Sequence, residues 1–129
     1  MSQWYGNARS NYFRVKDKEK FKELCNSWFL SFIEEDNKVG FLCDGDNGGL
    51  PSYKYESDVE LNFDDFLKEL SECLIDEEVA ILFEVGSEKL AYLTGVAYAI
   101  NNKNEQKRIS LEEIYERAKP LGKNIETII

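Results

Sequence analysis

Residues 78–100 read EVAILFEVGSEKLAYLTGVAYAI, and this stretch decides the fold class. Two apolar runs, 78–85 and 90–100, flank the turn-forming residues 86–89, which predicts a β-hairpin. The second run places Leu90, Tyr92, Val96, Tyr98 and Ile100 on one face, and Ala91, Leu93, Gly95, Ala97 and Ala99 on the other. Because a strand that is apolar on both faces is normally covered on both, we expect residues 90–100 to form a central, covered strand.

A helix is predicted immediately before this hairpin. Asn62 is a favourable N-cap residue, and acids in the first turn suit the positive end of the helix dipole. Apolar residues follow at helical spacing, at Phe63, Phe66, Leu67, Leu70 and Leu74. Residues 44–60, which precede it, are rich in Gly and acids and predict a loop.

The N-terminal part predicts a strand, a helix and a hairpin. Residues 11–16 form a short run in which Phe13 and Val15 share one face, as in a strand. Asp17 is a plausible N-cap for a first helix, whose apolar stripe is Phe21, Leu24, Cys25 and Trp28. Residues 29–34 and 39–43 then predict two strands joined by a turn.

A last helix is predicted from a capping box in which Ser110 is the N-cap and Glu113 occupies N3. We expect it to bury Leu111, Ile114, Tyr115, Ala118 and Leu121 and to end before Gly122. Pro120 disfavours helical backbone in the residue before it and so hastens the end of the helix.

The predicted order β-α-β-β-α-β-β-α indicates an α+β fold, an antiparallel sheet with helices on one face. Its first six elements have the βαββαβ order of the ferredoxin-like sandwich, with an extra strand and a C-terminal helix. A sheet that wraps differently, or a first strand that fails to pair, remains an alternative. With no visible linker or repeat, residues 1–129 are interpreted as a single domain.

The negative charge is concentrated in the middle of the chain. Residues 31 to 88 hold 17 Asp and Glu against 3 Lys and Arg, within a formal net charge of −9. Such a surface attracts basic partners and repels phosphate backbones, so direct nucleic-acid binding is disfavoured. A basic patch around Arg9, Arg14, Lys16, Lys18 and Lys22 is the alternative, although most of these residues fit a solvated helix start.

Residue types that usually carry catalysis or bind cofactors are sparse. There is no histidine, and the three cysteines, Cys25, Cys43 and Cys73, form no close pair and fit an apolar pattern. Residues 44–49 resemble the start of a calcium loop, but positions 5 and 12 are Gly48 and Tyr55, so we interpret them as an acidic loop and leave a weak cation contact open. We expect no catalytic residue, no cofactor and no metal.

Three short stretches resemble a set of small uncharacterised acidic proteins of bacteria, their plasmids and their phages. They are SNYFRVKD at residues 10–17, LPSY at residues 50–53 and EVGSEK at residues 84–89. The resemblance implies an intracellular protein of mobile-element context and no particular reaction. With no apolar stretch long enough for a membrane span, we expect a soluble, cytoplasmic protein.

Our leading hypothesis is a non-enzymatic binding protein that presents its acids to a basic protein, as inhibitors that imitate DNA do. The candidate contact residues are Glu34, Glu35, Asp36, Asp44, Asp46, Asp58, Glu60, Asp64, Asp65, Glu69 and Glu72. The plainer interpretation is that these acids only keep the domain soluble. An alternative function is a regulatory or structural domain that self-associates through a sheet face or edge and the aromatics Trp4, Tyr5, Tyr53 and Tyr55. An enzyme built on paired carboxylates is a third hypothesis.

Overall fold

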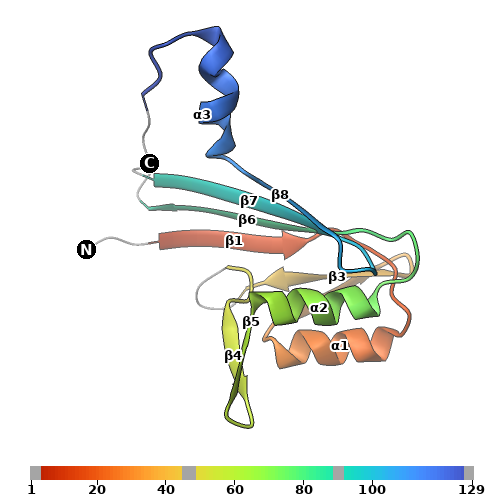
Figure 1. Cartoon of the computed structure of the whole chain (residues 1–129). Helices are drawn as coiled ribbons and strands as arrows, with labels where there is room; N and C mark the ends of the chain where they lie inside the picture. The colour runs from red at the N-terminus through yellow and green to blue at the C-terminus, as the bar shows by residue number, and fades with distance from the viewer. Residues whose placement is uncertain (1–3, 45–48, 89–91, 127–129) are drawn as a thin grey trace.

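A computed structural model describes residues 4–44, 49–88 and 92–126. These residues form an α+β fold with a six-stranded antiparallel sheet, a two-stranded sheet and three α-helices (Figure 1). The large sheet consists of β1 (Trp4–Ser10), β2 (Ser31–Glu35), β3 (Lys38–Cys43), β6 (Ala80–Glu88), β7 (Tyr92–Ile100) and β8 (Gln106–Ser110). Its strand order is β2-β3-β1-β6-β7-β8. Within the described ranges, no helix has the length and apolarity that crossing a membrane requires.

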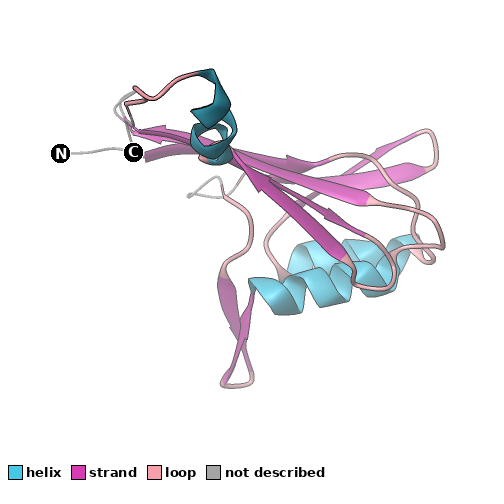
Figure 2. Cartoon of the chain, turned by 45° about the horizontal axis from the view of Figure 1, so that its top comes forward, coloured by secondary structure: helices cyan, strands magenta, loops and turns pink. Residues whose placement is uncertain are grey.

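The helices predicted after Asp17 and after Asn62 are both confirmed, and the two residues cap them as expected. The Asp17 carboxylate accepts hydrogen bonds from the Glu19 and Lys20 amides at the start of α1 (Lys18–Ser27). Asn62 forms a capping box with Asp65 at the start of α2 (Phe63–Cys73). The two helices lie side by side on one face of the sheet (Figures 1 and 2).

The core lies between these helices and the sheet and is rich in aromatic rings. Phe13, Phe21, Phe41 and Phe66 are fully buried. The rings of Phe41 and Phe66 meet edge to face at 5.7 Å, so strand β3 and helix α2 interlock at this contact. Such ring pairs add stability beyond the apolar area that they bury.

The position of the predicted first strand is wrong. The strand is Trp4–Ser10, whereas Phe13 and Val15 form isolated bridges to Val39 and Leu74. Three residues lie between Arg9 and Phe13 but only two between their partners Leu42 and Val39, so the segment after β1 carries a one-residue bulge where it runs along β3.

Polar side chains complete the hydrogen bonding at this bulge. The buried Ser10 hydroxyl accepts from the Phe41 amide at 2.9 Å and donates to the Asn11 carbonyl at 2.7 Å. The Asn11 side chain accepts from the Ile81 amide at 2.8 Å. These side chains replace ladder hydrogen bonds where the chain leaves the sheet, and Phe13 still reaches the core as the alternation predicted.

The loop predicted at residues 44–60 contains a hairpin, β4 (Tyr53–Glu56) with β5 (Val59–Asn62). Ser57 and Asp58, at its turn, have positive φ values of 50° and 68°, as a type I′ turn requires. The missed signal was the alternation in YKYE, which the surrounding turn residues and acids obscured. The hairpin extends from the helix layer beside the start of α2 (Figure 1).

The C-terminal part also differs from the prediction. Ser110 ends the additional strand β8, and only half of the expected capping box forms, with the Glu113 carboxylate accepting from the Ser110 amide. Helix α3 is short (Glu113–Ala118) and a 3-10 turn (Lys119–Leu121) follows. The predicted burial of Leu111, Ile114 and Leu121 is wrong, because all three are exposed.

Candidate functional site

The first candidate acids lie at one end of the β2–β3 hairpin. Glu34 is ion-paired with Lys18 at the start of α1, so its charge is already balanced. Glu35 and Asp36 are exposed at the turn, where Asp36 and Asn37 both have positive φ. This group is therefore a hairpin tip with two carboxylates that make no ion pair within the described residues.

A second group of acids lies at the other end of β3. Asp44 accepts from the Ser31 hydroxyl at 2.7 Å, Asp58 and Glu60 are exposed on the β4–β5 hairpin, and Asp64 and Asp65 begin α2. Since the six residues of β3 span about 17 Å, the two groups do not form one patch. Asp46, and with it the weak cation contact considered for residues 44–49, lies outside the described residues.

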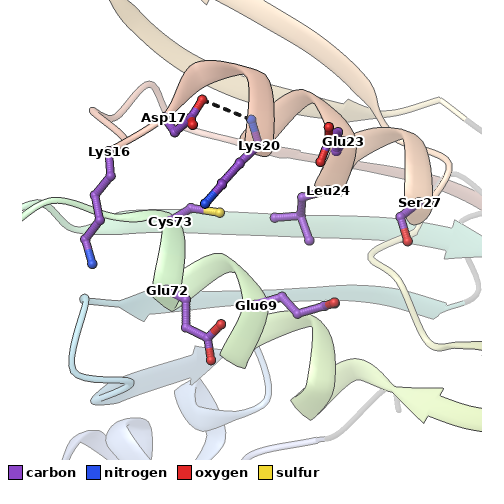
Figure 3. A pocket seen from close by; sticks show the side chains of 9 residues that line it. All are labelled: Lys16, Asp17, Lys20, Glu23, Leu24, Ser27, Glu69, Glu72 and Cys73. Carbon is purple, nitrogen blue, oxygen red and sulfur yellow. Dashed lines mark hydrogen bonds between the residues drawn. The ribbon is translucent and has the colours of Figure 1, made fainter.

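Glu69 and Glu72 line an open groove of about 500 Å³ between α1 and α2 (Figure 3). Glu69 accepts from the Trp28 indole N–H at 2.6 Å, so this carboxylate fixes a core ring. Lys16 and Lys20 line the same groove, which is therefore mixed in charge rather than uniformly acidic. A groove of this kind offers neither a continuous acidic surface nor an apolar pocket.

Lys54 anchors the β4–β5 hairpin to the end of α1. Its side chain is buried, its ammonium donates to the Ser27 carbonyl at 3.3 Å, and it lies 4.4 Å from the centre of the Trp28 ring. A cation at the C-terminal end of a helix is favoured by the helix dipole, and the ring face adds a cation–π contact. The ammonium also donates to the Ser27 hydroxyl and lies 3.6 Å from the Glu56 carboxylate.

The cysteines are confirmed as buried or half-buried residues of the core. Burial raises the pKa of the Cys25 and Cys43 thiols to about 12. Burial also raises the pKa of Cys73, and the nearby Glu72 and Glu69 carboxylates add to this rise. Protonated thiols are poor nucleophiles, so none of the three is activated.

The open face of the sheet, defined as the face opposite α1 and α2, carries several exposed large apolar side chains. Strand alternation and register place Phe83 and Val85 of β6, Leu93 of β7 and Ile109 of β8 on it, and these side chains are 46%, 52%, 43% and 61% exposed. The prediction that β7 is central is right, since it lies between β6 and β8, but the prediction that both of its faces are covered is wrong.

The apolar side chains of the open face are contiguous. Phe83 pairs with Ala97, which pairs with Ile109, so these three residues form one row across three strands. Val85 and Gly95 form the next row, and Leu111 packs where a Gly95 side chain would stand. The sequence signal was the small-residue face of β7 beside the alternating Phe83 and Val85.

The open face also differs from the rest of the molecule in charge. Among the described strand residues that alternation places on it, Arg9, Lys38 and Lys107 are basic and Glu35 is acidic. A second acid, Asp44, borders the same face, where it lines a hollow with Arg9 and Phe83. Of the basic patch considered above, Arg9 lies on this face and stacks on Tyr12, Arg14 pairs with Glu78, Lys18 pairs with Glu34, and Lys22 pairs with Glu19. That patch is therefore dispersed.

The aromatics proposed for self-association are only partly described. Tyr53 and Tyr55 are exposed on the β4–β5 hairpin, with ring centres 6.1 Å apart. The backbone of Trp4 and Tyr5 belongs to β1, and their side chains lie outside the described part of the structure.

Comparison with known proteins identified no relative of the chain. No family model, no curated protein and no solved structure matches the chain. Within the described ranges, no group of three or more Asp, Glu, Cys or His side chains is placed to hold a metal ion. The open face of the sheet is therefore the candidate functional site, and its function is argued from its geometry and chemistry alone.

Proposed function

We propose that the chain is a non-catalytic binding domain that self-associates through the open face of its sheet. The observation that carries the proposal is a contiguous apolar row, in which Ala97 lies between the exposed Phe83 and Ile109, on a sheet face that α1 and α2 leave uncovered (Figure 2). Contiguous exposed apolar patches usually mark contact surfaces, whereas scattered single residues do not. Fully burying each such side chain contributes about 1.5–3 kcal/mol, and these residues keep roughly half of their surface in water.

The distribution of charge supports a second copy of the chain as the partner that binds the open face. With a net charge of −9, two copies repel each other over most orientations. The open face has three basic residues and one acid among its described strand side chains, with Asp44 at its border, so its local charge is close to neutral and two such faces repel each other less than the acidic surfaces do. A dimer formed this way buries apolar surface while its acidic surfaces point outward.

Sedimentation tests this proposal with a matched pair of variants. We expect the unmodified chain to be dimeric at roughly 50 µM, above an assumed Kd of about 1 µM, and Phe83→Asp to be monomeric. Val59→Asp is the control, because Val59 is also exposed but lies on the β4–β5 hairpin, and it should remain dimeric. Raising the salt concentration should strengthen association, since it screens like charges. A monomer at 100 µM, or equal effects of the two variants, would contradict the proposal.

A second candidate function is the binding of a basic protein by the acidic end of the molecule. The observation that favours it is that Asp58, Glu60 and Asp64 are exposed and make no ion pair among the described residues. Competition with duplex DNA for a basic nuclease would test it, with Asp58→Asn, Glu60→Gln and Asp64→Asn combined in one variant. Binding that weakens with salt and is lost in the variant is the expected result. Binding that the triple variant leaves unchanged would contradict it.

We also infer that β1, α1, β2, β3, α2 and β6 form a ferredoxin-like core. What supports this inference is that β1 lies between β3 and β6, antiparallel to both, with α1 and α2 on one face. The β4–β5 hairpin, β7, β8 and α3 would then be additions to that core. The proposed binding surface would include both core strands and added strands.

A further inference from the structure

We propose that the outer face of the β4–β5 hairpin, defined as the face that carries Tyr53, Tyr55 and Glu60, binds arginine side chains of a basic partner protein. This inference rests on the second candidate function, the binding of a basic protein by the acidic end of the molecule. It names the side chain that the partner supplies and the residues that receive it. It does not depend on self-association through the open face.

The two faces of the hairpin differ in what covers them. Strand alternation and register place Lys54 and Leu61 on one face, where Lys54 is buried and its ammonium donates to the Ser27 carbonyl of α1. Tyr53 and Tyr55 are on the outer face and are 62% and 66% exposed. Neighbouring aromatic rings that stay in water on an uncovered sheet face are typical of a contact surface.

The two tyrosine rings form an edge-to-face pair. Their centres are 6.1 Å apart and their planes make an angle of 82°. The negative face of a tyrosine ring attracts a cation, and the planar guanidinium group of arginine stacks on it. The molecule contains one such contact already, since the Arg9 guanidinium lies 5.7 Å from the centre of the Tyr12 ring. The exposed hairpin rings offer the same contact to an arginine of another protein.

A carboxylate stands beside these rings. Glu60 pairs directly with Tyr55 across the hairpin, and the Cβ atoms of such cross-strand pairs are about 4.5–5.5 Å apart. Glu60 is exposed and makes no ion pair within the described residues. A guanidinium group that stacks on Tyr55 can therefore donate two parallel hydrogen bonds to the Glu60 carboxylate.

The charge around the outer face is complementary to a basic segment. Asp58 at the hairpin turn and Asp64 at the start of α2 are also exposed and make no ion pair in the described part of the chain. Lys54 is the only base of the hairpin, and it lies on the opposite face near Glu56. Carboxylates that no base neutralises attract an arginine-bearing segment and repel a phosphate backbone.

The hairpin is held in place before any partner binds. Lys54 fixes it to the end of α1, and Leu61 packs against the core. Ser57 and Asp58 close it with a turn of the type that two-residue hairpins favour. Because ordering a mobile segment lowers affinity, a site built on an anchored hairpin loses less of its binding free energy than a free loop does.

Arginine is the expected side chain rather than lysine. A guanidinium group is planar, weakly hydrated and able to stack on a ring while it forms paired hydrogen bonds to a carboxylate, whereas an ammonium group is a compact and strongly hydrated point charge. A site that combines Tyr55 with Glu60 uses both properties of the guanidinium group. A site that used charge alone would bind the two side chains equally.

Peptide titration followed by fluorescence anisotropy tests the inference. The probes are two labelled peptides of equal length and charge, one in which arginine alternates with glycine and one in which lysine does. We expect the unmodified chain to bind the arginine peptide roughly 5–10-fold more tightly than the lysine peptide. Tyr55→Leu should weaken binding of the arginine peptide by roughly 2–5-fold and reduce this preference. Tyr55→Phe keeps the ring and should preserve both.

A pair of glutamate variants separates the proposed contact from the effect of net charge. Glu60→Gln and Glu56→Gln each remove one negative charge from the hairpin, but Glu56 alternates onto the face opposite Tyr55. Glu60→Gln should weaken binding of the arginine peptide by about 5-fold, whereas Glu56→Gln should weaken it by less than about 2-fold. Equal losses would mean that the peptide responds to charge alone, and the arginine site would be wrong.

The outcomes separate this inference from the second candidate function. If the unmodified chain binds both peptides with equal affinity, arginine recognition is wrong and the binding of a basic protein stands. If neither peptide binds at concentrations up to about 1 mM, both fail together. Tyr55, Glu56 and Glu60 are exposed, so the variants should keep the fold, which urea unfolding checks. A folded Tyr55→Leu variant that retains the full arginine preference would also overturn the inference.

Discussion

The two faces of the six-stranded sheet are built from the same strands but differ in what covers them. Leu82 and Ile100 point toward α1 and α2 and are fully buried. One residue further along β6, Phe83 points to the open face and keeps 46% of its surface exposed. Strands β6 and β7 thus carry apolar side chains on both sides, while the described chain supplies a layer of two packed helices for only one. This difference indicates that the covered face maintains the fold and that the open face is available for binding.

The largest expected effect comes from comparing one phenylalanine on each side. Phe66→Ala removes a fully buried ring that packs against Trp28 and Phe41, so we expect the free energy of unfolding to fall by about 3–5 kcal/mol. Phe83→Ala should lower it by less than about 1 kcal/mol when measured on monomers at high dilution. Urea unfolding monitored by circular dichroism measures both values. Equal losses would break the comparison, because they would mean that the open face is buried within the monomer.

A smaller effect is expected at Gly40, which alternation places on the open face. A Cβ there would lie 2.6 Å from the Asn11 carbonyl oxygen and 2.9 Å from the Ser10 hydroxyl. Because the nearer atom belongs to the backbone of the bulge, Gly40→Ala should destabilise the fold by about 1–3 kcal/mol. Gly122→Ala is the control, since a Cβ at Gly122 meets nothing within 4 Å, and it should change stability by less than about 0.5 kcal/mol. Unaltered stability of Gly40→Ala would show that the bulge is not rigid.

The smallest effect concerns the thiols on the covered side. A pKa of about 12 instead of the ordinary 9.0 leaves Cys25 and Cys43 with roughly 1,000-fold less thiolate at pH 8, so an aromatic disulfide reagent should modify them far more slowly in the folded chain than in urea. Between pH 9 and 12 the unfolded chain loses these protons first, so the free energy of unfolding should fall as pH rises, whereas below pH 9 it should be insensitive to these groups. Equal rates of modification with and without urea would contradict their burial.

The parts of the fold that sequence reasoning predicted correctly depend on local signals. Asp17 and Asn62 are N-caps followed by apolar stripes, and both helices begin where these residues indicate. The first strand was misplaced because Phe13 and Val15 alternate like a strand, although each pairs with a different partner across a bulge. Nothing local distinguishes such a pair of bridges from a continuous ladder.

The candidate site could be predicted only in part. The acids were identified residue by residue, but their separation into two groups depends on the length and direction of β3, which composition does not reveal. The stripe of Leu111 and Ile114 was recognised and assigned to the core, because helical periodicity indicates that a helix packs without identifying its partner. The open face follows from strand register, and register needs the three-dimensional structure.

The central position of β1 has a consequence for how the chain acquires its fold. Trp4 pairs with Glu88, so the middle of the sheet joins segments that are far apart in the sequence. During synthesis, β1 remains without its β6 neighbour until the chain through residue 88 has emerged, and closing so long a loop slows folding. We therefore expect the nascent chain to expose a strand edge until residue 88 has emerged, which makes early folding intermediates the stage at which aggregation is most damaging.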